Sequence, residues 1–178
     1  MRLFVAIDLP WDLRERMTLL AGRGIQGARW VPAENFHLTL RFIGETQAWQ
    51  AEEIDHAFAA LRARRFALTL AGVGTFSKAG RATQLWVGVE RNPPLDHLRA
   101  KIETALQRAG LTPERRRFVP HITLARLDNA VESRLAAFVQ QHNLFRAEPV
   151  MVEHFTLFSS RLGKEQAVYM PEVEYPLD

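Results

Sequence analysis

The chain has no cysteine among its 178 residues. This absence excludes disulfides, cysteine nucleophiles and thiolate metal ligands. The sequence also has no run of about 18 uncharged apolar residues, which a membrane-spanning helix would need, and its N-terminal segment is too charged for a secretory signal. We therefore expect a cytoplasmic protein with no membrane association.

Lysine is scarce as well. Only Lys78, Lys101 and Lys164 are lysine among the 23 basic residues, so the others are arginine, and the formal net charge is +3. Arginine binds phosphate through paired hydrogen bonds and stacks on nucleobases. The excess mildly favours a phosphate-bearing partner, although genomic base composition or thermal adaptation explains it equally well.

Apolar periodicity predicts interleaved strands and helices. We expect strands at 2–9, 28–31, 36–43, 66–76, 84–90, 121–126, 150–160 and 166–175, and helices at 11–21, 47–64, 92–110 and 131–142. Residues 22–27 read as a loop, and the polar segment 77–83 as a hairpin or a lid loop. Short connections between neighbouring strands favour antiparallel pairing, which predicts an α+β fold. We expect residues 1–178 to form one domain.

One motif occurs twice. HLTL at 37–40 recurs as HITL at 121–124, each within an expected strand. Side chains alternate across a strand, so each histidine shares a face with the threonine two residues later, while the leucine and isoleucine residues face the core. The same alternation puts Arg41 on the face of His37, and Phe42 on the buried face. The repeat predicts two lobes that face each other across a cleft.

Paired His-x-Thr motifs suit chemistry at phosphorus. Histidine gives or takes a proton near neutral pH, so His37 and His121 can act as acid and base in one displacement. The hydroxyls of Thr39 and Thr123 can donate to the non-bridging phosphoryl oxygens, where charge builds in the transition state. Such a pair predicts a bell-shaped rate profile between two near-neutral pKa values.

Other chemistries are disfavoured by the residues present. The chain has no GxSxG elbow for acyl transfer. Threonine is a poor zinc ligand, and no carboxylate falls on the face of either motif. The glycine-containing stretch GVGTFSKAG lacks the GK[ST] ending of a P-loop. We therefore expect no metal and no cofactor.

Four stretches carry a family resemblance: LFVAIDLP at 3–10, RWVPAENFHLTLRFIGE at 29–45, RRFVPHITLAR at 116–126, and FTLFSSRL at 155–162 followed by Tyr169. On these stretches the chain resembles the two-histidine phosphoesterases, and within them the bacterial and archaeal RNA 2′,3′-cyclic phosphodiesterases, historically called 2′-5′ RNA ligases. The resemblance spans essentially the whole chain.

The resemblance implies a bilobal fold, with two antiparallel sheets facing each other across a central cleft and helices outside. It implies an RNA substrate that ends in a 2′,3′-cyclic phosphate, hydrolysed to a 2′-phosphate without metal. In that scheme His37 protonates the departing 3′ oxygen, His121 takes the proton of the attacking water, and Thr39 and Thr123 hold the non-bridging oxygens. The acid and base labels come from the family alone.

Three further residues are candidates for substrate contacts. Arg126 stands where relatives often place a base-stacking cation, although strict alternation puts it opposite His121 unless the strand bulges. Arg41 either assists a phosphate or is a solvated charge. Phe4 either offers an aromatic surface to a base or fills the core.

Alternatives to hydrolysis remain. The reverse reaction would join a 5′-hydroxyl to the cyclic phosphate and form a 2′-5′ bond. From other classes, the chain is a catalytically weak nucleotide- or RNA-binding module, or a phosphodiesterase of a small cyclic nucleotide metabolite. The expected partner is RNA with a cyclic phosphate end or a 2′-5′ linkage. No protein partner is implied, and a monomer is expected.

Overall fold

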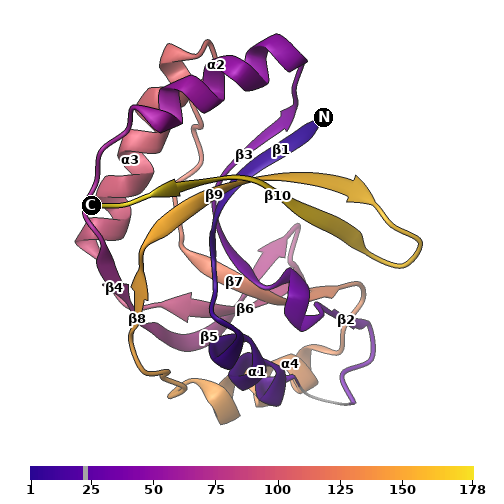
Figure 1. Ribbon diagram of the computed structural model, residues 1–178. Coiled ribbons are helices and arrows are strands. Elements are labelled where there is room, and N and C mark those ends of the chain that lie inside the picture. The colour runs from indigo at the N-terminus through magenta and orange to yellow at the C-terminus, as the bar shows by residue number, and fades with distance from the viewer. Residues whose placement is uncertain (22–23) are drawn as a thin grey trace.

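Strands and helices alternate along the chain in the computed structural model, which describes residues 1–21 and 24–178 (Figure 1). The strands are β1 Arg2–Asp8, β2 Ala28–Trp30, β3 His37–Glu45, β4 Phe66–Leu68, β5 Leu70–Lys78, β6 Arg81–Val89, β7 His121–Leu127, β8 Val150–Val152, β9 His154–Leu162 and β10 Ala167–Pro176. The helices are α1 Trp11–Leu20, α2 Ala48–Ala59, α3 Pro93–Arg108 and α4 Glu132–His142, with a 3₁₀ turn, η1, at Ala33–Asn35. The predicted loop at 22–27 lies partly outside the described residues.

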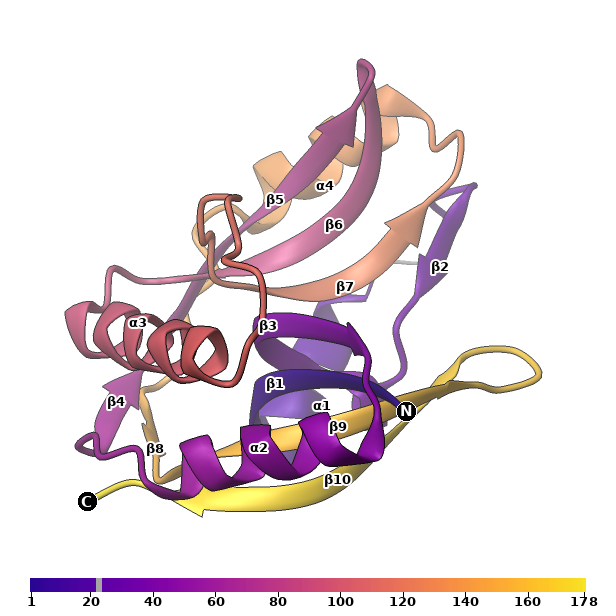
Figure 2. The ribbon, with the colours of Figure 1, turned by 90° about the horizontal axis from the view of Figure 1, so that it is seen from above.

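Two four-stranded sheets form the frame. One has the order β10-β9-β1-β3 and the other β2-β7-β6-β5, while β4 and β8 pair separately; all of these pairings are antiparallel. The predicted α+β fold with antiparallel sheets is confirmed. Figure 2 shows the two larger sheets as separate layers, which come closest where β3 contacts β7. The strands that carry the two motifs are therefore neighbours in space.

One hydrophobic cluster joins the two sheets. It contains the alternate residues of β1, β3, β6 and β7 that point away from the motif histidines, together with the apolar faces of the helices. In α3 the large buried apolar residues are Leu95, Leu98, Ile102 and Leu106, at the helical spacing that predicts a helix over 92–110. The helix starts at Asn92, whose side chain accepts the amide hydrogen bond of Leu95 at 3.0 Å, a standard N-cap.

The structure corrects several predicted boundaries. The strand expected at 66–76 is divided into β4 and β5, because β4 pairs with β8 whereas β5 pairs with β6. The strand expected at 150–160 is divided into β8 and β9 for the same reason, because only β9 joins β1. Helix α2 ends at Ala59, since residues 63–65 form backbone hydrogen bonds with Asp178 instead. Gly44 does not end β3, which continues to Glu45.

The segment 77–83 is a tight hairpin. β5 runs to Lys78 and β6 starts at Arg81, which leaves Ala79 and Gly80 as the turn. Their φ angles of 52° and 77° are those of a type I′ turn, the two-residue connection whose twist matches that of the strands. Of the two alternatives for this segment, the hairpin is confirmed.

Candidate active site

The two motif histidines make the same hydrogen bond. Nδ1 of His37 lies 2.7 Å from the carbonyl oxygen of Asn35, and Nδ1 of His121 lies 2.7 Å from that of Val119. A carbonyl oxygen only accepts, so Nδ1 of each ring carries the proton and donates it. Nε2 is thereby the proton-exchanging atom of both rings, held in one tautomer by the backbone two residues earlier.

Each motif strand contains a β-bulge just after its threonine. The register of β3 against β1 skips Leu40, and the register of β7 against β6 skips Leu124. An extra residue reverses the alternation of faces for the residues that directly follow it. The two motifs are therefore related by their bulges as well as by their residues.

The bulges decide where the predicted contact residues point. Arg126 is exposed on the face of His121, which confirms the bulged alternative. Phe42 occupies the equivalent place in β3; it is 59% exposed, and the prediction that it is buried is wrong. Arg41 is only 9% exposed and points to the other side of the sheet, so its predicted position beside His37 is also wrong.

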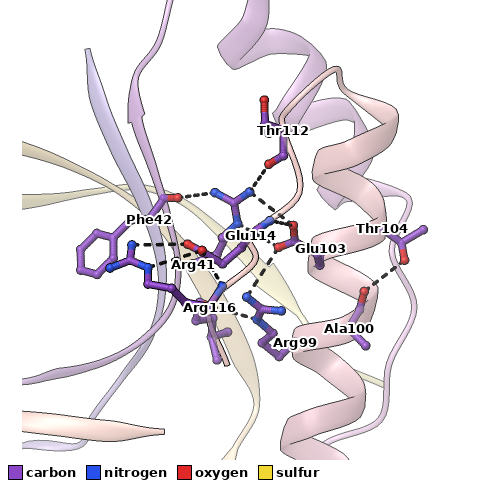
Figure 3. A network of polar contacts seen from close by, with 10 residues as sticks. Arg41, Phe42, Arg99, Ala100, Glu103, Thr104, Thr112, Glu114 and Arg116 are labelled. Atoms are coloured by element: carbon purple, nitrogen blue, oxygen red, sulfur yellow. Dashed lines mark hydrogen bonds and ion pairs between the residues drawn. The ribbon is translucent and has the colours of Figure 1, made fainter. Parts of the chain in front are cut away.

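Arg41 belongs to a buried polar network (Figure 3). Its Nε donates to Oε2 of Glu103 at 2.8 Å, and a terminal nitrogen donates to the carbonyl oxygen of Thr112 at 2.6 Å. The other carboxylate oxygen of Glu103 accepts the amide of Glu114 at 2.8 Å. Burial opposes ionisation of Glu103, but the hydrogen bonds from Arg41 and Glu114 lower its pKa overall. The network holds the start of the segment that leads into His121.

Arg14 holds the segment before His37, as Arg41 holds the segment before His121. The sequence did not single Arg14 out. Its guanidinium is paired with Asp8 and donates to the carbonyl oxygens of Ala33 and Glu34, both at 2.9 Å. These carbonyls belong to η1, which supplies the Asn35 carbonyl to His37. The signal was its place on the buried side of α1, one turn before Met17.

Aromatic rings surround His37. The ring of Phe4 lies 5.0 Å from that of His37, and Tyr169 meets the same imidazole edge-on at 5.1 Å. Phe158 stacks on Phe4 at 5.2 Å and lies 6.4 Å from the imidazole of His37. Phe4 is 3% exposed, so its interpretation as an open surface for a base is wrong. Phe4 instead packs against the imidazole of His37.

His121 is supported in a comparable way. Phe76 meets its ring edge-on at 4.7 Å, and Trp86 lies 6.4 Å away. The indole of Trp86 lies against Gly74, its partner across the strands, and an added Cβ there would come to 2.5 Å from the ring. A glycine at 74 is thus what allows the indole to lie against the sheet.

This burial lowers the pKa of both imidazoles. Desolvation lowers the pKa of His37 from 6.5 to about 4; the Asn35 carbonyl and Asp8 oppose this effect, while the positive charges of Arg14 and Arg126 add to it. Desolvation also lowers the pKa of His121, against the effect of the Val119 carbonyl. Two near-neutral values were expected, and the value of about 4 for His37 lies below that range. Because Arg126 belongs to the other sheet, its influence on His37 links the two motif faces.

Each motif threonine lies two residues after its histidine on the same strand. Thr39 and Thr123 are both half-buried. The hydroxyl of Thr123 donates to Oε1 of Gln84 at 3.1 Å. Gln84 is a second residue that the sequence did not single out, because its place beside Thr123 depends on the register between β6 and β7.

A groove of about 530 Å³ lies between η1 and the β9–β10 hairpin, with Asn35 and Tyr169 among its walls. None of the four motif residues is among the residues that line this groove. Within residues 1–21 and 24–178, no three histidine, aspartate or glutamate side chains cluster so as to hold a metal ion. None of the helices in the same part of the chain is both long enough and apolar enough to cross a bilayer.

Known proteins resemble this chain in sequence and in fold. The family model of the 2′-5′ RNA ligase superfamily matches residues 16–164. The chain belongs to this superfamily. The predicted resemblance is thereby confirmed, and the matched span contains both His-x-Thr motifs.

Two relatives and one solved structure illustrate the similarity. The RNA 2′,3′-cyclic phosphodiesterase of Aeropyrum pernix is 43% identical over 101 residues, which cover 56% of this chain and only 57% of the relative. The enzyme of that name from Escherichia coli is 32% identical over 175 residues, covering 96% and 93%. A crystal structure of E. coli LigT complexed with 3′-AMP has a TM-score of 0.80 and 29% identity, covering 99% and 97%. This similarity confirms the predicted bilobal fold of paired sheets.

Proposed function

We propose that this chain hydrolyses 2′,3′-cyclic phosphates at RNA ends to 2′-phosphates, without a metal ion. The observation that carries the proposal is the matched setting of His37 and His121. Both rings donate from Nδ1 to a backbone carbonyl, and both keep Nε2 for proton exchange. Two imidazoles prepared in the same way suit a reaction in which one proton is removed and another is delivered. The names of the E. coli and A. pernix relatives give the same reaction.

The steps follow from these atoms. Nε2 of His121 takes a proton from water, whose oxygen forms a bond to phosphorus. The bond from phosphorus to the 3′ oxygen breaks, and that oxygen receives the proton of His37 Nε2. Thr39 and Thr123 donate hydrogen bonds to the two non-bridging oxygens, where negative charge grows. The acid and base roles are those of the family and exchange in the reverse direction.

The lowered pKa of His37 is consistent with a general acid that becomes protonated when the substrate binds. In the free protein this imidazole is neutral at pH 7, because its pKa is about 4. A bound phosphodiester brings a negative charge next to Nε2, and an opposite charge favours the imidazolium form. The proton is thus taken up together with the substrate.

The remaining candidates separate into two groups. Arg126, exposed on the face of His121, contacts the base or the backbone of the RNA. Arg41 and Phe4 do not touch substrate: Arg41 positions the segment before His121, and Phe4 supports the ring of His37. The working unit is a monomer of one bilobal domain, because a single chain supplies both motifs. We place it in the cytoplasm, since its substrate is RNA.

One assay tests the proposal. The protein is incubated with 2′,3′-cyclic AMP and with a short RNA that ends in a cyclic phosphate, each with and without EDTA. We expect a 2′-phosphate product that is insensitive to EDTA, and a loss of rate of about 10²-fold or more in His37→Gln and in His121→Gln. Binding without turnover would identify a binding module, and loss of activity in EDTA would identify a metal enzyme; either result refutes the proposal. Formation of 2′-5′ linkages from added 5′-hydroxyl RNA would report the reverse reaction.

A further inference from the structure

Two arginines lie directly opposite each other on neighbouring strands of the second sheet. Arg29 of β2 pairs with Arg126 of β7, which in turn pairs with Gln84 of β6. Both arginines are exposed. Trp30, the next residue in β2, packs on Phe138 of α4, so Arg29 points the other way, to the face of His121. Two guanidinium groups and an amide thus form one row across three strands.

This pair is unfavourable for the free sheet. Like charges directly opposite on adjacent strands are destabilising. Among residues 1–21 and 24–178, no carboxylate forms an ion pair with either guanidinium. A local conflict of this kind is expected at sites that bind a ligand of opposite charge. Arginine pairs bind phosphate oxygens through two parallel hydrogen bonds each.

We propose that Arg29 and Arg126 bind the phosphodiester on the 5′ side of the nucleotide that carries the cyclic phosphate. This inference rests on the proposed function and makes it more specific: the preferred substrate is a polynucleotide end, and a mononucleotide leaves the arginine pair unused.

The position of the row fits this assignment. Because Leu124 is bulged, Arg126 is the next residue after Thr123 on this face, about 7 Å further along the strand. That step is long enough to lead from the cyclic phosphate held by Thr123 to the linkage on its 5′ side. Gln84 lies between the two places: it pairs with Arg126 across the strands, its Oε1 accepts from Thr123 when no substrate is bound, and its amide NH₂ can donate to a phosphate oxygen held by the arginines.

The test compares three substrates: 2′,3′-cyclic AMP, the dinucleotide ApA with a 2′,3′-cyclic phosphate, and the same dinucleotide with an uncharged methylphosphonate linkage. The measured quantity is the ratio of kcat/KM for each dinucleotide to kcat/KM for the mononucleotide. We expect the wild type to prefer the charged dinucleotide, and Arg29→Gln to lower that ratio about tenfold, as for the loss of one exposed charge-assisted hydrogen-bonding pair. Arg29→Lys retains part of the preference, because it keeps the charge.

A matched control separates this effect from a general loss of positive charge. Arg134, exposed on α4 of the same lobe, is replaced in Arg134→Gln, which leaves all three rates unchanged. The inference is overturned if Arg29→Gln keeps the wild-type ratio. It is also overturned if the methylphosphonate dinucleotide is as good a substrate as the charged one, which would assign the arginines to base stacking. In both cases the hydrolysis of 2′,3′-cyclic AMP still stands, whereas failure of the wild type to hydrolyse any of the substrates refutes the proposed function as well.

Discussion

Arg41 and Glu103 form a buried ion pair with Nε and Oε2 2.8 Å apart, although 62 residues separate them in the sequence. Arg41 lies on the strand of the first motif, and Glu103 holds the amide of Glu114 in the segment that enters the second. The strand that carries His37 therefore supports the approach to His121. This explains why Arg41, next to the first motif, is buried in the polar network and not exposed beside His37.

Removing Glu103 should be costly. In Glu103→Ala the guanidinium of Arg41 stays buried without its partner, and we expect the free energy of unfolding to fall by about 3–5 kcal/mol. Urea denaturation measures this change, and kcat should fall with it as the segment before His121 loosens. The matched control is Glu90→Gln, which breaks the exposed pair between Glu90 and Arg146 and should cost no more than about 1 kcal/mol. Equal losses in the two variants would contradict the role given to the buried pair.

The pH dependence of kcat/KM follows from the two lowered pKa values. The reaction needs one imidazole protonated and the other neutral, and in the free protein that state is most populated between the pKa values of His37 and His121. Both values lie below 6.5, that of His37 at about 4. We therefore expect a bell-shaped profile with its maximum on the acid side of pH 6.5 and a fall above it. The measurement is kcat/KM for 2′,3′-cyclic AMP from pH 4 to 9 at constant ionic strength; a plateau that extends to pH 8 would rule this out.

At saturating substrate the pH dependence of kcat should differ from that of kcat/KM. The bound phosphodiester raises the pKa of each imidazole, so the maximum of kcat should lie at higher pH than that of kcat/KM. Coinciding maxima would show that the substrate does not charge His37.

Alternation of side chains along strands predicted the motif faces correctly only as far as each bulge. His37, Thr39, His121 and Thr123 precede the bulges, and they lie where a period of two residues puts them. Arg41, which follows the bulge, was misplaced, because one extra residue exchanges the two faces. Nothing within LTLRF reveals that residue, since a bulge is defined by the register against another strand.

Arg14 and Gln84 were not predicted from the sequence for the same physical reason. Arg14 acts through the carbonyl oxygens of η1, and Gln84 acts through a cross-strand contact with Thr123. Both relationships depend on pairs of segments distant in the sequence. By contrast, α3 was predicted well because its cap, its prolines and its apolar face are local signals.

Stability should depend on the protonation of His37. Its pKa falls from 6.5 in the unfolded chain to about 4 in the folded one, so folding favours the neutral ring. The stabilisation is complete above pH 6.5 and is lost as the pH falls toward 4, by about 3 kcal/mol. His37→Gln lacks this dependence, so the difference between its free energy of unfolding and that of the wild type should change by that amount between pH 7 and pH 4. His97→Gln, at an exposed position on α3, should leave the dependence as in the wild type. Parallel curves for the wild type and His37→Gln would contradict the burial of a neutral imidazole.

The contact between Gly74 and Trp86 gives a last prediction. A Cβ at 74 would come within 2.5 Å of the indole, so Gly74→Ala must displace that ring from the sheet. Overpacking of this kind costs about 1–3 kcal/mol, and the displaced indole disturbs Phe76 and, through it, the ring of His121. We expect lower stability together with a lower kcat. Trp86→Leu in the Gly74→Ala background removes the clash and should restore the stability lost, whereas Trp86→Leu alone should be destabilising. If the double variant is no more stable than Gly74→Ala, the glycine is needed for its backbone and not for the space it leaves to the indole.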